Sequence, residues 1–119
     1  MNYSFESVIS GLSAYIDKAI FPTFNKTQSF LGHFLIGRYV SNISILKSVL
    51  VENEFLKPLA LFNSDGFVDV ESIMTDLKNT MNHVGNFEIN IPLVGPYSFG
   101  PTDLDILYNC IKEKTNENY

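Results

Sequence analysis

The sequence predicts an α+β fold that is mainly helical, with four to five helices around a central apolar helix and one C-terminal β-hairpin. Two observations predict this fold. First, apolar residues recur at helical spacing over most of the chain. Second, between residues 87 and 99 the apolar residues recur at every second position, which is typical of strands. The 119 residues are near the usual size of one domain, and no linker divides them, so we expect a single domain over 1–119.

The first predicted helix runs from Ser4 to Ile20. Its apolar residues fall on one stripe, and its polar residues fall opposite, as in a helix that covers a core. Pro22 ends this helix, because the residue before a proline avoids the helical region.

The second predicted helix runs from about Thr27 to Val51, and its apolar side chains point almost all the way round. A helix of this kind lies either at the centre of a core or in a membrane. The exception is a narrow strip of small residues, at spacings of four, three and four, formed by Gly37, Ser41, Ser44 and Ser48. Because such a strip lets another backbone come close, we take these four as candidate interface residues.

The run from Phe30 to Val51 is long enough to cross a membrane. It contains Arg38, however, and an arginine at mid-span costs about 2.5–3.5 kcal/mol on insertion scales. That cost about cancels the gain from several Leu and Ile. We therefore expect no membrane span.

The third predicted helix begins at Asp69, a capping residue, and ends near His83, where Gly85 is placed to stop it. The turn before it, residues 63–69, looks like the middle of a calcium-binding EF-hand loop. Leu61 and Ser72 would then fill positions one and twelve, which need carboxylates. We read the segment as a turn and a helix cap.

From Phe87 to Leu93 apolar and polar residues alternate, which predicts a strand. Gly95-Pro96 would turn the chain, and Tyr97–Phe99 would return as a second strand. Pro92 cannot donate to a ladder, so we expect an edge ribbon, and its edge is another candidate surface.

The last predicted helix runs to about Lys114, with Thr102 and Asp105 resembling a capping box at its start. From about Thr115 the sequence reads as a polar tail. Ile106 and Cys110 lie off the core stripe of this helix and form a second apolar spot, which we take as a further candidate interface.

Charge and composition exclude several functions. The net charge is −5, with +1 over residues 1–58 (five bases, four acids) and −6 over 59–119 (three bases, nine acids). Nucleic-acid binding needs clustered Lys and Arg, and here the bases are scattered. The lone cysteine fits a reducing compartment, and the N-terminus lacks the basic and apolar regions of a signal peptide, so we expect a cytoplasmic location.

No pattern in the sequence predicts catalysis. There is no nucleophile elbow and no Gly-rich phosphate loop. His33 and His83 stand fifty residues apart, without carboxylates at ligand spacing. We therefore expect no enzyme, no catalytic residue, no metal and no cofactor.

Three segments in the second half of the chain, 65–70, 87–93 and 103–108, resemble small uncharacterised proteins of phages and prophages of Gram-positive bacteria. The matching residues are mostly turn, cap and core positions, so they mark a fold and not a site. The resemblance implies a small virion component or accessory protein, located in the host cytoplasm or in the virion.

Taken together, these patterns favour a non-enzymatic structural or interaction protein that self-associates, with a second copy or other phage proteins as partners. The apolar second helix and the low share of charged residues, 18%, motivate this hypothesis. The alternative is a soluble acidic inhibitor or accessory factor that binds a host protein, which the −6 balance of residues 59–119 motivates.

Overall fold

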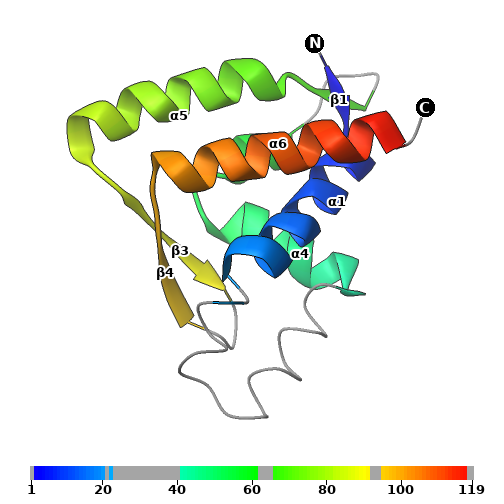
Figure 1. Ribbon diagram of the computed structural model, residues 1–119, viewed down its shortest axis with the longest axis horizontal. Helices are drawn as coiled ribbons and strands as arrows, with labels where there is room; N and C mark the ends of the chain where they lie inside the picture. The colour runs from blue at the N-terminus through cyan, green and yellow to red at the C-terminus, as the bar shows by residue number, and fades with distance from the viewer. Residues whose placement is uncertain (1, 21, 23–40, 62–65, 92–94, 118–119) are drawn as a thin grey trace.

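Figure 1 shows the computed structural model, which describes residues 2–20, 22, 41–61, 66–91 and 95–117. Several predicted features lie outside these residues, namely most of the second helix with His33, Gly37 and Arg38, most of the turn at 63–66, and Pro92. The described part is α+β and mainly helical, as predicted. Its elements, in chain order, are β1 (Tyr3–Ser4), α1 (Phe5–Tyr15), the π-helix η1 (Ile16–Ile20), α4 (Ile43–Glu52), the 3-10 helix η2 (Lys57–Ala60), β2 (Phe67–Val68), α5 (Val70–Val84), β3 (Phe87–Ile91), β4 (Gly95–Phe99) and α6 (Pro101–Glu117).

The first predicted helix is confirmed. Ser4 caps α1 by accepting a hydrogen bond from the backbone N–H of Ser7 at 3.2 Å. The helical backbone continues through Ile20 as the wider π-helical turn η1. Among the described residues, α1 is the helix that other elements surround, since it contacts β1, η1, α4, η2 and α6.

The closest helix packing is where α6 crosses α1 (Figure 1). At this crossing Gly11 of α1 faces Ile111 of α6. A Cβ on Gly11 would lie 2.6 Å from the Ile111 Cα and 2.8 Å from its backbone nitrogen. Glycine is therefore required here by the close approach of two backbones.

The prediction of one unbroken helix from Thr27 to Val51 is wrong at Asn42. Asn42 has an extended backbone (φ −112°, ψ 105°), and its side-chain oxygen accepts from the N–H of Ile45 at 3.3 Å. An asparagine that caps a helix satisfies the backbone locally and so competes with continuing the helix. As a result α4 begins at Ile43, and its buried side is limited to Leu46, Val49 and Leu50.

The predicted hairpin is confirmed, with antiparallel pairing from Phe87↔Phe99 to Ile91↔Gly95. Gly95 and Pro96 belong to β4, however, and do not form the turn. Pro96 pairs with Asn90 of β3. The backbone N–H and carbonyl of Asn90 both bond to the side chain of Asn53, so they point away from β4. Pro96 therefore sits at a position where the ladder needs no N–H.

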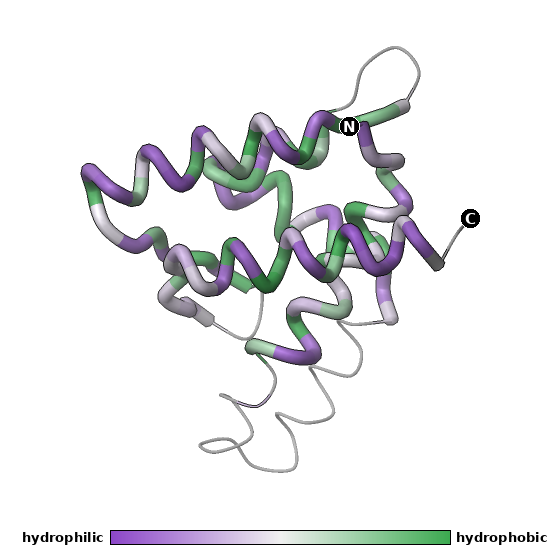
Figure 2. Tube along the Cα trace, turned by 45° about the horizontal axis from the view of Figure 1, so that its top comes forward, coloured by the Kyte–Doolittle hydropathy of each residue, from purple (hydrophilic) through white to green (hydrophobic). Residues whose placement is uncertain are grey.

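The third predicted helix is also confirmed. Asp69 caps α5 by accepting from the N–H of Ser72 at 3.3 Å, and Gly85 ends it with φ at +86°. Hydrophilic and hydrophobic residues alternate along α5 in Figure 2, as expected of a helix with one face on the core. Just before it, β1 and β2 form a two-residue antiparallel sheet.

The predicted ends of the last helix need correction. α6 starts at Pro101, and proline suits the first turn of a helix. The Asp103 carboxylate accepts a hydrogen bond from the N–H of Gly100, the residue before the helix, at 3.0 Å. The predicted capping box of Thr102 and Asp105 is therefore wrong. At the other end α6 runs to Glu117. Thr115 is buried, and its hydroxyl donates to the Ile111 carbonyl at 2.9 Å, so no polar tail begins at residue 115.

Candidate interaction surface

One side of α4 exposes two large apolar side chains, Ile43 and Val51. At about 100° per residue, five residues share this side, and we call them the α4 outer face: Ile43, Ser44, Lys47, Ser48 and Val51. Ile43 is 59% exposed and Val51 is 51% exposed, whereas the residues of the opposite side are buried. A helix that exposes large apolar side chains on one face is suited to contact another protein.

The polar groups of the α4 outer face are partly satisfied within the chain. The Ser48 hydroxyl donates to the Ser44 carbonyl at 3.1 Å. The Lys47 ammonium lies over the Phe5 ring of α1, 5.4 Å from its centroid.

The predicted strip of small residues is not continuous in the structure. Ser44 and Ser48 lie on the α4 outer face, Ser41 precedes the break at Asn42, and Gly37 lies outside the described residues. Ser41 and Ser44 are exposed, and Ser48 is half-buried.

Ile106 and Cys110 do not form an apolar spot on the surface of the described chain. Ile106 is half-buried against the core, and Cys110 is only 2% exposed. The reason is that α6 contacts both α1 and α5, so it buries more than one stripe of side chains. The same burial raises the pKa of the Cys110 thiol, which disfavours the reactive thiolate.

The edge of β3, another predicted surface, is partly occupied from within the chain. Asn53, at the end of α4, is 4% exposed. Its side chain accepts from the Asn90 N–H at 2.7 Å and donates to the Asn90 carbonyl at 3.0 Å, and it also donates to the Val49 carbonyl at 2.7 Å. The amide thus takes the place that a neighbouring strand would have at Asn90.

Two carboxylates in the first turns of helices each accept two tyrosine hydroxyls. Asp103 of α6 accepts from Tyr15 at 3.1 Å and from Tyr97 at 2.9 Å. The sequence signal, an acid in a first helical turn, is visible at Asp103, but Tyr15 lies 88 residues away in the chain. Burial, and next the charge of Asp103, raise the pKa of Tyr15, so this hydroxyl stays protonated and serves as a donor.

Glu71 of α5 forms the second cluster of this kind. It accepts from Tyr3 at 3.3 Å and from Tyr108 at 3.0 Å, and the two rings pack edge to face. Each cluster joins segments that are far apart in sequence.

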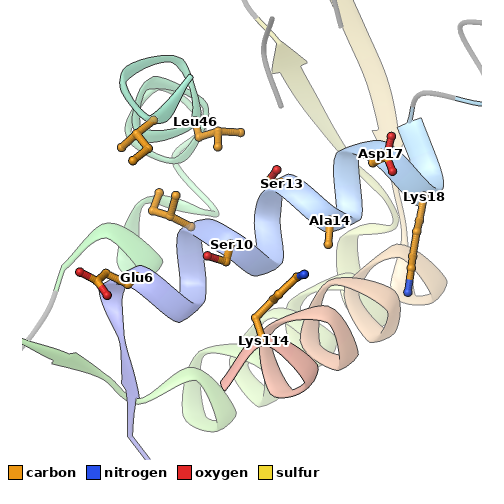
Figure 3. Close-up of a pocket in the computed structure, with 10 residues that line it drawn as sticks. Glu6, Ser10, Ser13, Ala14, Asp17, Lys18, Leu46 and Lys114 are labelled. Atoms are coloured by element: carbon orange, nitrogen blue, oxygen red, sulfur yellow. The ribbon is translucent and has the colours of Figure 1, made fainter. Parts of the chain in front are cut away.

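An open groove of about 770 Å³ runs between α1, α4 and the end of α6 (Figure 3). Ile9 and Leu46, both buried, form its apolar part, and Ile43 connects it to the α4 outer face. Its charged residues are of both signs: Glu6, Asp17, Lys18 and Lys114. This mixture defines no single ligand chemistry.

Within the described ranges, no group of three or more His, Cys, Asp and Glu residues could hold a metal ion. His83 is exposed in the last turn of α5. In the same part of the chain, no helix is long and apolar enough to cross a membrane.

Comparison of the chain with known proteins finds no matching family model, no matching curated protein and no matching solved structure. The resemblance to phage and prophage proteins therefore stays a prediction from the sequence.

Proposed function

We propose that this protein is a non-enzymatic structural or interaction protein that self-associates through the α4 outer face. The observation that supports this proposal is the exposure of two large apolar side chains, Ile43 and Val51, on one side of one helix. Ser44 and Ser48 lie on the same side and are small. Small residues let a second helix approach closely and bring the flanking apolar side chains into contact.

The proposed partner is a second copy of the chain, because a two-fold contact needs only one self-complementary surface. Other phage proteins are the remaining candidates. The resemblance of residues 65–108 to small phage and prophage proteins supports a role as a virion or accessory component, in the host cytoplasm or in the virion.

The decisive experiment compares the variants Val51→Lys and Val84→Lys. Val51 lies in the last turn of α4 and Val84 in the last turn of α5, and both are more than half exposed. A positive charge is favoured at either helix C-terminus, so both variants should fold. Only Val51 belongs to the α4 outer face.

The absolute mass is measured by light scattering on a sizing column without detergent. We expect a discrete oligomer for the unmodified chain, a lower mass for Val51→Lys, and an unchanged mass for Val84→Lys. A monomeric unmodified chain would contradict the proposal. Equal masses for the two variants would exclude the α4 outer face as the contact.

The charge distribution favours a second candidate function, a soluble acidic inhibitor or accessory factor that binds a basic host protein. Residues 59–119 carry a net charge of −6, and carboxylates such as Asp76 and Glu88 are exposed on different elements. Exposed charges of one sign attract an oppositely charged partner and speed its association.

The test is retention of a basic protein from a Gram-positive host lysate on the immobilised chain. We expect release between about 0.1 M and about 1 M salt, because the screening length falls from about 10 Å to about 3 Å. Replacing Asp76 and Glu88 with Lys should weaken retention, whereas Glu54→Lys, an exposed change in the near-neutral half, should not. Retention that is indifferent to salt and to these changes would rule out this function.

A further inference from the structure

We draw no further inference here: the strongest candidate, the open groove of about 770 Å³ between α1, α4 and α6, combines apolar residues with charges of both signs, and nothing in the structure shows what covers it.

Discussion

At the scale of single residues, Gly11 sets how closely α1 and α6 approach each other. The Ile111 backbone occupies the space that a Cβ on Gly11 would need. Backbone atoms cannot move aside as a flexible side chain can, so the two helices would have to separate. Because the Leu12 and Leu107 side chains of these helices are fully buried, a separation would loosen the core.

We predict that Gly11→Ala destabilises the protein by about 1–3 kcal/mol, as overpacking of a core usually does. The sign of this change in stability is informative, because in an exposed helix alanine is more favourable than glycine by about 1 kcal/mol. Urea unfolding measures the free energy of unfolding of the variant and of the unmodified chain. Ser10→Ala, one residue earlier on α1, is the control and should change stability little. A more stable Gly11→Ala variant would show that α1 and α6 pack less closely than described.

At the scale of elements, Asn53 joins the end of α4 to β3. Its amide makes three hydrogen bonds to backbone atoms, two of them to Asn90, which is 37 residues away in the chain. A buried amide with all three bonds formed specifies one relative position of the helix and the hairpin.

We predict that Asn53→Ala destabilises the protein by about 2–3 kcal/mol, because it removes three hydrogen bonds that a buried side chain makes to the backbone of Asn90 and Val49. Asn90→Ala is the matched control. Only backbone atoms of Asn90 take part in these bonds, so we expect a change of less than about 0.5 kcal/mol. Thermal or urea unfolding of both variants checks the difference, and similar losses would contradict the role given to Asn53.

The elements that the sequence predicted correctly are those with local signals. Asp69 and Gly85 directly flank α5 and mark its two ends. The alternation of apolar and polar residues marks β3. The break at Asn42 was missed because the apolar pattern continues across it. The exposure of Ile43 and Val51 was missed because the sequence does not tell which apolar side of a helix a neighbour covers.

The contacts between distant elements could not be predicted. Asn53 and Asn90, or Tyr15 and Asp103, carry no pattern that links them, because these pairs meet only after the helices have packed. Likewise, the sequence pattern predicts a surface spot at Ile106 and Cys110, because nothing in it indicates that α6 contacts both α1 and α5.

At the scale of the whole molecule, the two tyrosine–carboxylate clusters connect the N-terminal segment to α5, α6 and the hairpin. In both clusters a neutral hydroxyl donates to a charged carboxylate. Ionisation of the tyrosine would replace this hydrogen bond with a repulsion between two negative groups. We therefore expect the contact between Tyr15 and Asp103 to make the stability of the fold sensitive to alkaline pH.

We predict a loss of stability above about pH 10, where tyrosine ionises in the unfolded chain. The pKa of Tyr15 in the folded chain is raised, chiefly by burial and next by Asp103. The contribution of Tyr15 to the free energy of unfolding is therefore complete below about pH 10. It is lost as the pH rises toward the pKa of Tyr15 in the folded chain, at up to about 1.4 kcal/mol per pH unit.

Tyr15→Phe tests this origin of the alkaline sensitivity. At neutral pH the variant should lose about 1 kcal/mol, the usual contribution of one hydrogen bond. Between pH 9 and 12 its free energy of unfolding should fall less steeply than that of the unmodified chain, when both are followed by urea unfolding. Parallel pH profiles would assign the sensitivity to other groups.

The position of Cys110 has a practical consequence. It is the only cysteine in the sequence, and it is 2% exposed on α6. A maleimide reacts with the thiolate, so it can modify only molecules in which this part of α6 has opened to solvent. Under conditions where closing is faster than labelling, the labelling rate measures the free energy of that opening. The native chain thus carries an intrinsic reporter that can show whether α6 detaches on its own or only when the whole fold is lost.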